Sequence, residues 1–287
     1  MRTDSFTIAT LLYKNTPPGF QSHSFFISKI NVLFSSVFLK LVLLLVTISL
    51  VFSCSSSKGT KSIDKNGYRL IFDGKTLEGW QYDPVYWRIE NSVLVGEITS
   101  STLLKRNSFI IKKDLITRDF DLKVDYRISS SGNSGINYRS VLIDSLPFAM
   151  RGYQADIDGQ NRYTGQNYEE RGRTTLAYPG QKVTINSSEN STPLKDNIKN
   201  NAWTKTMVTG SFGNTDSLKS HIKIEDWNEC HLIVKGNRLL HYINNVLISD
   251  VTDNDTMYRK FSGRLGVQVH VGPPMKIEYK NFRLKEL

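Results

Sequence analysis

The strongest chemical signal in the sequence is a run in which polar and apolar residues alternate. Within Gly152–Gly159, one amide and two carboxylates stand at every second position, as Gln154, Asp156 and Asp158. Successive side chains of a β-strand point to opposite faces, so these three side chains would share one face. Carboxylates two positions apart on a strand lie roughly 6.5–7 Å apart, which favours a raised pKa on one of them or a cation held by both. The pattern predicts the floor of a polar cleft, with Asp156 and Asp158 as candidate ligands of Ca²⁺ or a similar divalent cation. The alternative is a solvated strand face that ends in a turn.

Shortly after this strand the chain carries a compact group of charges. Tyr168–Arg173 contains two adjacent acids, Glu169 and Glu170, followed by Arg171 and Arg173. A carboxylate beside two guanidinium groups suits a polar or anionic ligand, because arginine forms paired hydrogen bonds with such groups. The pattern therefore makes Glu169, Arg171 and Arg173 candidates for holding such a ligand group. A surface ion-pair cluster would show the same residues.

Two other short motifs deliver polar side chains to strands. A glycine-rich turn over residues 132–135 leads into a strand that carries Asn133 and Arg139. Near the C-terminus, Gln268 and His270 alternate with valines and so share one strand face. Amide, guanidinium and imidazole groups bind hydroxyls, and imidazole also moves protons. These four residues therefore join the candidate site.

The elements that must position these residues are short β-strands. Phe120–Ile128 alternates strictly between apolar and charged residues, as a strand with one buried and one solvated face does. Asn244–Asn245 separates two apolar runs and is typical of a tight hairpin turn. No window of about a dozen residues after Cys54 has a helical period, and frequent short strands favour a β-sandwich or barrel. The polar stretch Asn186–Ser220, which carries Trp203, is expected to be a long loop.

Composition narrows the class of protein. The chain has 287 residues, 39% of them hydrophobic, and a formal net charge of +10 at pH 7. This is a globular composition and excludes a wholly disordered chain. The positive charge is spread out with no basic block, so nucleic acid is not expected as a partner. Two cysteines exclude a disulfide scaffold, and Cys230 in an alternating strand is expected to be an inert buried thiol. The glycine pattern of nucleotide-binding loops and the serine nucleophile elbow do not occur.

The N-terminal region reads as an export signal. Lys40 precedes the apolar run Leu41–Phe52, which ends at a small residue followed by Cys54. A basic flank, a short apolar run and a small residue at the cut form a secretory signal, and the run is too short for a comfortable membrane span. The cysteine at the cut resembles a bacterial lipobox, so Cys54 would be lipidated; a single membrane anchor is the alternative. The protein is therefore expected to be lipid-anchored in a bacterial cell envelope, on an outer membrane and facing the periplasm, and its only membrane contact would be the lipid. The expected organisation is a signal peptide at 1–54, a linker at 55–66 and one β-domain at 67–287. The segment before the apolar run is unusually long for a signal, which favours a translation start later than residue 1.

Four motifs, taken in order, resemble one family. They are Ile71–Trp80 (IFDGKTLEGW), Gly132–Arg139 (GNSGINYR), Gly152–Ile157 (GYQADI) and Gly266–Gly272 (GVQVHVG). They are similar to motifs of the 3-keto-disaccharide hydrolase family, and the resemblance extends over about residues 68–287.

The resemblance implies a concanavalin-like jelly-roll β-sandwich, an all-β fold of two antiparallel sheets, that binds carbohydrate on its concave face. It also implies cleavage of 3-keto-glycosides or disaccharides, either by hydrolysis or by elimination followed by hydration. A ketone at C3 acidifies the hydrogen on C2, so a base can remove that hydrogen while the group at C1 departs. Such a site needs a base, a group that polarises the ketone and an acid for the leaving oxygen.

The candidate residues take roles on this basis. Asp156 or Glu169 would be the base, and His270 would be the acid or the donor to the ketone. The family strand usually carries Glu followed by Gln, whereas this chain has Gln154 followed by Asp156, so the usual acid is not carried over. Trp203 would stack on a sugar ring. The side chains expected to bind substrate are Asn133, Arg139, Gln154, Arg171, Arg173, Trp203 and Gln268.

Two alternatives from other classes stay open at this point. A sandwich of this type can serve as a non-catalytic, lectin-like carbohydrate-binding module, which the loss of the usual Glu favours. A structural envelope protein is the other alternative. Fold alone does not decide among the three.

Overall fold

A computed structural model describes residues 63–187, 199, 201, 203 and 206–287 of the chain. Contacts divide the chain into two compact units, Met1–Thr60 and Lys61–Leu287, and the described residues belong to the second. The expected signal peptide, the lipidated Cys54 and most of the expected linker lie outside the described residues. None of the helices in the described part of the chain has the length and apolar character needed to span a bilayer.

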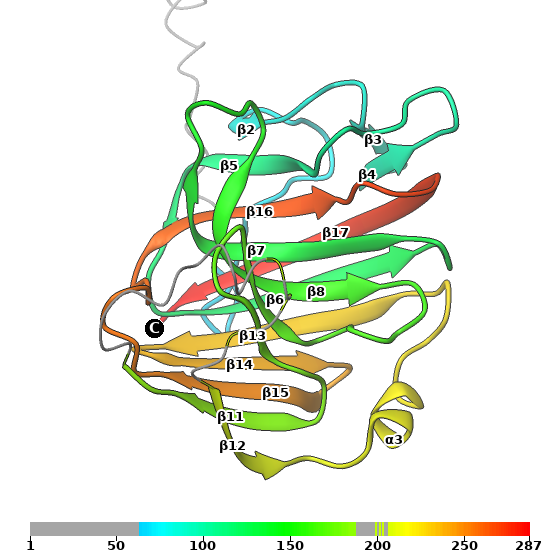
Figure 1. Cartoon of the computed structure of the whole chain (residues 1–287). Helices are drawn as coiled ribbons and strands as arrows, with labels where there is room; N and C mark the ends of the chain where they lie inside the picture. The colour runs from blue at the N-terminus through cyan, green and yellow to red at the C-terminus, as the bar shows by residue number, and fades with distance from the viewer. Residues whose placement is uncertain (1–62, 188–198, 200, 202, 204–205) are drawn as a thin grey trace, which may run out of the picture. The chain divides into compact units, whose positions relative to one another are not determined.

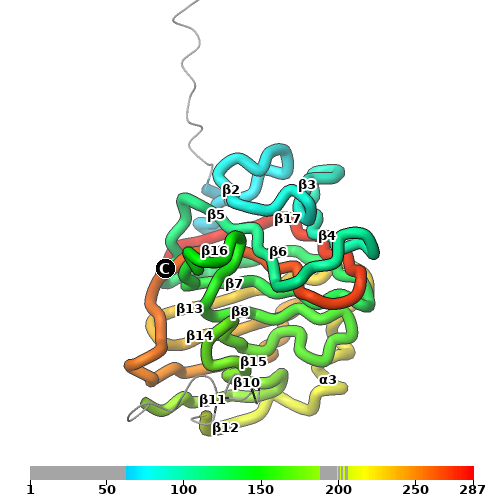
Figure 2. Tube along the Cα trace, turned by 45° about the horizontal axis from the view of Figure 1, so that its top comes forward, coloured from blue at the N-terminus to red at the C-terminus, as the bar shows by residue number. Residues whose placement is uncertain are grey.

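Two β-sheets packed face to face form the second unit (Figures 1 and 2). The larger sheet has ten strands, and their pairing order is β12 (Thr206–Ser211), β11 (Gln181–Ile185), β15 (Val246–Asp253), β14 (Arg238–Ile243), β13 (Asn228–Lys235), β6 (Phe120–Ile128), β17 (Met275–Glu286), β4 (Val93–Ile98) and β3 (Trp87–Glu90), with β1 (Arg69–Leu70) also paired to β17. The smaller sheet has seven strands, in the order β10 (Thr174–Ala177), β9 (Asn167–Glu170), β8 (Met150–Asp158), β7 (Asn133–Leu142), β16 (Gly263–Val269), β5 (Ser108–Thr117) and β2 (Trp80–Gln81).

The predicted all-β jelly-roll sandwich is confirmed, with one departure from purely antiparallel pairing. Strands β11 and β15 run parallel, with Val183 opposite Val251. The chain enters β11 from β10, which belongs to the other sheet, so no hairpin forces β11 to run against its neighbour.

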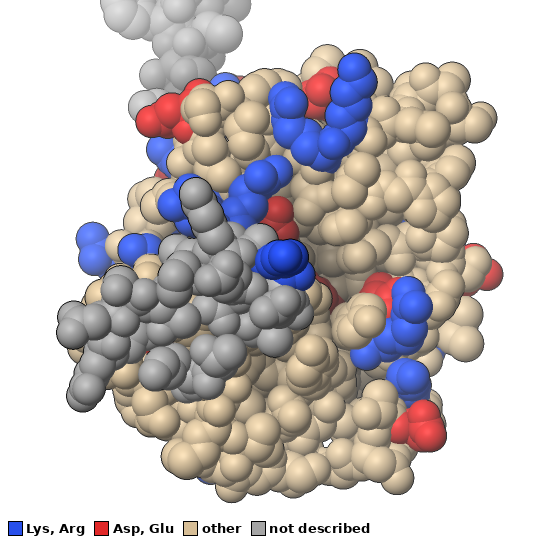
Figure 3. Space-filling view, viewed as in Figure 1, with Lys and Arg blue, Asp and Glu red and all other residues tan. Residues whose placement is uncertain are grey.

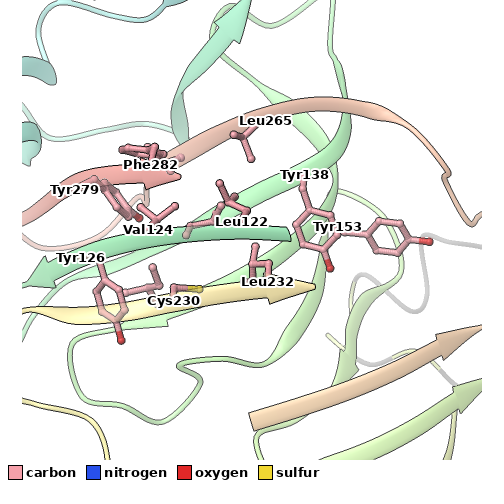
Figure 4. Close-up of a cluster of buried hydrophobic side chains, with 14 of the residues drawn as sticks. Leu122, Val124, Tyr126, Tyr138, Tyr153, Cys230, Leu232, Leu265, Tyr279 and Phe282 are labelled. Atoms are coloured by element: carbon pink, nitrogen blue, oxygen red, sulfur yellow. The ribbon is translucent and has the colours of Figure 1, made fainter. Parts of the chain in front are cut away.

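Apolar side chains from both sheets fill the space between them, as the alternation in Phe120–Ile128 predicts. Strand β6 spans those residues, and its apolar members are buried while the charged ones are partly exposed. Leu122 faces Leu232 of β13, and Val124 faces Cys230 (Figure 4). Truncating a fully buried leucine such as Leu122 to alanine would cost about 2–5 kcal/mol. Cys230 is free and buried, and burial raises the pKa of its thiol, as expected for an inert cysteine.

Two expectations about connections have different outcomes. The Asn244–Asn245 hairpin is confirmed: both residues have positive φ, 48° and 66°, the backbone that a two-residue turn between twisted strands requires. The stretch Asn186–Ser220 is not simply a loop, because it contains β12 and the helix α3 (Thr215–Lys219). Strand β12 pairs with β11, and α3 buries Leu218 in the core while Asn214 caps its N-terminus.

Strand β8 presents one apolar and one polar face, and this division determines where a site can lie. Tyr153, Ala155 and Ile157 belong to the core between the sheets. Gln154 and Asp156 therefore point to the outer face of the seven-stranded sheet, away from the ten-stranded sheet. The prediction that Gln154 and Asp156 share one face of the strand is thus confirmed. A site formed by these residues must lie on the outer face of the seven-stranded sheet.

Candidate functional site

A polar cavity of about 440 Å³ opens on the outer face of the seven-stranded sheet. We call it the main cavity. Figure 3 shows this hollowed region, with acidic atoms inside it and Lys and Arg around it. Strands β7, β8 and β9 contribute the floor, and loops supply the rim. The lining residues are Arg106, Asn107, Asn133, Gln154, Asp156, Tyr163, Gln166, Tyr168, Glu170, Arg171, Asn201, His270 and Val271.

Asp156 lies on the floor of the main cavity, and its side chain is almost completely buried. Burial raises the pKa of its carboxyl to about 7, and the nearby charge of Glu170 contributes to the rise. Two amides act in the opposite direction: the Nε2 of Gln154 donates to Oδ1 across 2.6 Å, and the Nε2 of Gln166 donates to Oδ2. A carboxyl with a pKa near 7 exchanges protons readily at neutral pH, which is the property a general base or acid needs.

Glu170 is the second carboxylate of the main cavity and comes from the end of β9. Burial raises the pKa of its carboxyl, against the pull of Arg171, whose Nε lies 3.6 Å from Oε1. Asn107 donates its Nδ2 to the same oxygen across 3.3 Å. Arg171 adopts a positive φ of 53° at the turn after β9. Its buried Nε makes no hydrogen bond to the described residues and faces the Glu170 carboxylate, so the positive charge of Arg171 lies beside that acid.

Side-chain amides link the two carboxylates. Gln268 is fully buried and donates its Nε2 to the Oε1 of Gln154 across 3.3 Å. The same side chain hydrogen-bonds Glu170 and thereby lowers the pKa of that carboxyl. Gly135 lies opposite Asp156 on β7, and a Cβ there would come within 2.6 Å of the Gln154 side chain. The glycine therefore makes room for Gln154 to reach Asp156.

Gln166 gives the main cavity an acceptor that the protein does not use. Its side chain is 4% exposed and lines the cavity, and its Oε1 has no hydrogen-bond partner. A buried carbonyl oxygen without a donor is costly, so the arrangement suits a ligand that supplies hydroxyl groups.

His270 lines the main cavity, but its protonation does not fit the expected role of acid. Its Nδ1 lies 2.6 Å from the carbonyl oxygen of Val271, which can only accept, so Nδ1 carries the hydrogen. Burial lowers the pKa of the imidazole, which keeps the ring neutral near pH 7. Its Nε2 is then an acceptor for a hydroxyl, and the ring does not donate to a ketone from that atom.

The structure places Glu169 and Arg173 outside the main cavity. Strand alternation points Glu169 inward when Glu170 points outward. Glu169 accepts from the Nε of Arg173, whose Nη2 contacts Asp253 across 2.7 Å. The Arg173 guanidinium is fully buried in these contacts. The expected roles of Glu169 as base and Arg173 as clamp are therefore corrected: the two side chains form a buried ion pair that holds β9 and β10 against β15.

Arg139 and Trp203 are likewise absent from the cavity lining. Arg139 is 1% exposed, and its Nη2 contacts Asp119 across 2.8 Å while Nη1 donates to the carbonyl of Gly236 across 2.7 Å. Trp203 is 3% exposed and packs edge to face against Tyr258, with ring centroids 5.6 Å apart. Both assignments as substrate contacts are corrected, because Arg139 is held by an ion pair and hydrogen bonds inside the protein and Trp203 is buried against Tyr258. Gln268 does not line the main cavity either. It donates a hydrogen bond to Gln154, which does.

Asp156 and Asp158, the predicted cation pair, have different hydrogen-bond partners in the structure. Asp156 is bound by two amides, whereas Asp158 accepts the backbone N–H of Gln160 across 3.0 Å and that of Arg162 across 2.9 Å. Asp158 thus closes the turn that follows β8. Within residues 63–187 and 206–287 and the three isolated described positions, no group of three or more His, Cys, Asp or Glu side chains is arranged to hold a metal ion.

Comparisons with known proteins identify one family model and several similar solved structures. A family model of the 3-keto-α-glucoside-1,2-lyase-like domain matches residues 67–285. No curated protein matches the chain. Among solved structures, a candidate glycosyl hydrolase from Parabacteroides distasonis is 18% identical, with 79% of this chain and 99% of that chain covered and a TM-score of 0.47. A carbohydrate-binding module from Bacillus subtilis is 16% identical, with 72% and 96% covered and a TM-score of 0.45. The β-glucanase of Bacillus licheniformis is 10% identical, with 78% and 100% covered and a TM-score of 0.46.

Proposed function

The chain belongs to the 3-keto-α-glucoside-1,2-lyase-like family, and on this premise we propose that it cleaves 3-keto-glycosides by elimination across C1 and C2. The observation that carries the proposal is Asp156, a carboxyl with a pKa of about 7 on the floor of a polar cavity. A ketone at C3 makes the C2 hydrogen acidic, and a base whose pKa lies near the working pH removes such a hydrogen efficiently.

The step balances with one residue acting as base and then as acid. The Asp156 carboxylate takes the proton from C2, and the electrons of that C–H bond form the C1=C2 double bond. The bond between C1 and the glycosidic oxygen breaks, and the proton held by Asp156 passes to that oxygen. The products are a cyclic 2-hydroxy-enone and the free aglycone. Addition of water across C1=C2 would then yield the 3-keto sugar.

Other groups in the main cavity have roles that follow from their geometry. The Arg171 guanidinium, which lines the cavity beside Glu170, polarises the ketone and stabilises the negative charge that develops on the ketone oxygen as the proton leaves. Gln154 and Gln166 hold the Asp156 carboxylate in place through their amides. Neutral His270 accepts a substrate hydroxyl through Nε2.

A lectin-like module is the second candidate, and one observation favours it. Gln154 stands where the family strand usually carries an acid, so one carboxylate has been replaced by an amide. In that case the amides of the main cavity would bind hydroxyls without any bond being broken.

We also propose that Cys54 carries a lipid that anchors the domain on an outer membrane, facing the periplasm. The apolar run before Cys54 and the small residue at the cut support this proposal. Replacement of Cys54 by alanine should release the protein from the membrane fraction. A Cys54→Ala protein that still sediments with membranes would contradict it.

The experiment that tests the function uses the purified protein with 3-keto-glucosides and their unoxidised parents. Aglycone release and the ultraviolet absorbance of the enone are followed together. The proposal expects both signals from the keto forms alone. Release from the unoxidised parents would point to an ordinary glycosidase, and binding without release would favour the lectin.

A further inference from the structure

Two polar side chains of the ten-stranded sheet, His241 of β14 and Ser249 of β15, lie in the core between the sheets. They stand opposite each other in the register of the two strands, and both are fully buried. Leu239 and Ile243, two positions to either side of His241, belong to the apolar core, so the imidazole points toward the seven-stranded sheet. Buried polar groups need hydrogen-bond partners, and the partners of these two side chains indicate their role.

His241 and Ser249 bind consecutive carbonyl groups at the end of the connection between β8 and β9. The Nδ1 of His241 lies 3.2 Å from the carbonyl oxygen of Gln166. The Oγ of Ser249 donates to the carbonyl of Gly165 across 2.7 Å. A carbonyl oxygen only accepts, so Nδ1 of His241 carries the imidazole hydrogen, and Nε2 accepts from the hydroxyl of Tyr138, 2.8 Å away in the core (Figure 4). Burial lowers the pKa of His241 to about 4, which keeps the ring neutral at pH 7.

The same two residues, Gly165 and Gln166, are also bonded to the backbone of Asp156. The N–H of Gly165 donates to the carbonyl of Asp156 across 2.8 Å, and the N–H of Asp156 donates to the carbonyl of Gln166 across 3.3 Å. Gly165 has a positive φ of 84°, and a Cβ there would lie 2.6 Å from the side chain of Ile248 on β15. The connection therefore lies directly against the ten-stranded sheet, and its backbone is held between that sheet and Asp156.

The side chain of Gln166 transmits this restraint to the main cavity. Its Nε2 donates to Oδ2 of Asp156, and this hydrogen bond lowers the pKa of that carboxyl. Asn167, the next residue, donates its Nδ2 to the Oγ of Ser249 across 3.0 Å and so fixes the chain on the other side of Gln166. Because a side-chain amide is placed by the backbone that carries it, the contacts from the ten-stranded sheet determine where the Gln166 amide lies.

We propose that His241 and Ser249 are positioning residues for the Asp156 carboxylate and that they act through Gln166. The inference rests on the proposed function, because that function makes the carboxylate the base. Neither His241 nor Ser249 lines the main cavity, so neither contacts substrate. Loss of either hydrogen bond loosens the Gln166 backbone and withdraws its amide from Asp156. The reactivity of the base then changes although every side chain of the cavity is still present.

Two variants of equal side-chain size isolate the contribution of His241. Both His241→Leu and His241→Asn lose the ring and its contact with Tyr138, but asparagine keeps an N–H donor for the carbonyl of Gln166. The measurement is the pKa of the Asp156 carboxyl, followed by carbon NMR with isotope-labelled aspartate and assigned by the resonance that is missing in Asp156→Asn. His241→Leu should raise this pKa by about one pH unit, because a hydrogen bond to a charged group is weakened. His241→Asn should stay close to the wild type, and equal values in the two variants would overturn the proposal.

Ser249→Ala keeps the test decisive if the His241 variants do not fold, which a thermal melt shows. It removes one hydroxyl and its hydrogen bond to the connection between β8 and β9, and it should also raise the pKa of Asp156. Thr117→Val is the matched control, because the buried Oγ1 of Thr117 donates to the carbonyl of Gly263 across 3.0 Å and does not line the main cavity. It should leave the pKa of Asp156 unchanged. A wild-type pKa in Ser249→Ala, or an equal rise in Thr117→Val, would overturn the proposal.

Failure of the proposed function gives a different result. If the wild-type protein cleaves no 3-keto-glucoside, the NMR titration of Asp156 still decides whether His241 and Ser249 position this carboxyl. If cleavage is observed, His241→Leu should lower kcat/KM at pH 7 by about tenfold and move the rising limb of the pH–rate profile to higher pH. A raised pKa by NMR in a variant whose pH–rate profile is that of the wild type would support the positioning and remove Asp156 as the base.

Discussion

Gln154 donates its side-chain amide to the carboxylate of Asp156, two positions further along the same strand, across 2.6 Å. Gln268 donates to the other end of the Gln154 amide and also reaches Glu170. Two amides therefore join the two acids of the main cavity. This arrangement orients the Asp156 carboxylate while burial keeps its pKa near 7.

Asp156→Asn removes the proposed base without changing the size of the side chain. Because general base catalysis contributes typically about 10²–10⁴-fold, we expect kcat to fall by that factor on a 3-keto-glucoside. Affinity for the substrate, measured by calorimetry, should change little. The exposed Asp144→Asn variant is the matched control and should retain full activity. Wild-type turnover in Asp156→Asn would remove Asp156 from the mechanism.

The pH dependence follows from the same carboxyl. Asp156 acts as a base only when it is ionised, so kcat/KM should rise with pH and level off above about pH 7. The measurement is a pH–rate profile between pH 5 and pH 9. A profile that is flat through this range, or one that falls as pH rises to 7, would contradict the assignment.

Stability should change with pH in the opposite sense. The folded pKa of Asp156, about 7, lies above its ordinary value of 3.8. The contribution of this group to stability is therefore complete below pH 3.8 and is lost as pH rises through 7. Asp156→Asn should therefore raise the free energy of unfolding at pH 8, by on the order of 4 kcal/mol at most, and by less at pH 5, and its melting temperature should rise accordingly. If Asp156→Asn changes the melting temperature by the same amount at pH 5 and at pH 8, ionisation of Asp156 does not destabilise the folded protein.

Gly135→Ala tests the positioning of the base. The new Cβ would come within 2.6 Å of the Gln154 side chain and push its amide away from Asp156. The carboxylate then loses a donor that lowers its pKa, so the rising limb of the pH–rate profile should move to higher pH. Gly210→Ala, where a Cβ meets only ordinary contacts on β12, is the control and should leave the profile unchanged. If the rising limb of Gly135→Ala lies at the same pH as that of the wild type, the hydrogen bond from Gln154 does not set the pKa of Asp156.

Substitution of Glu169 and of Glu170 by glutamine should affect different properties of the protein, stability in the first case and activity in the second. Glu170→Gln changes the main cavity and should lower kcat/KM while the protein stays folded. Glu169→Gln weakens the buried pair with Arg173, and breaking such a pair typically costs about 3–5 kcal/mol. It should therefore lower the midpoint of urea unfolding. If Glu169→Gln lowers turnover and leaves stability untouched, the placement of the two acids is reversed.

The fold could be predicted from local patterns because a sandwich needs little more than alternation and turn residues. Strand β6 begins and ends at the residues that the alternation indicates, Phe120 and Ile128. The Asn244–Asn245 turn follows from the preference of asparagine for positive φ. The parallel pairing of β11 with β15 could not be predicted. The chain crosses from the seven-stranded sheet to the ten-stranded sheet between β10 and β11, and no local pattern shows beside which strand β11 will lie.

The candidate site was predictable only where one strand face decides it. Alternation in β8 predicts the position of Asp156. It does not distinguish Glu169 from Glu170, because both are polar and the sequence does not fix which of the two faces inward. The buried roles of Arg139 and Arg173 could not be predicted, because their acidic partners, Asp119 and Asp253, are distant in the chain and give no local signal. Gln166 and Asn107 could not be predicted for a related reason. They reach the main cavity from loops, and the sequence around them carries no periodic pattern.

The most direct test of the account is the rate of aglycone release from a 3-keto-glucoside that carries deuterium at C2. If Asp156 removes the C2 hydrogen in the slow step, release from the deuterated substrate should be several-fold slower than from the protonated one, and the enone should appear with the aglycone. Equal rates with no enone at any time, together with release from the unoxidised glucoside, would contradict elimination and show that the bond at C1 is cleaved by ordinary glycoside hydrolysis.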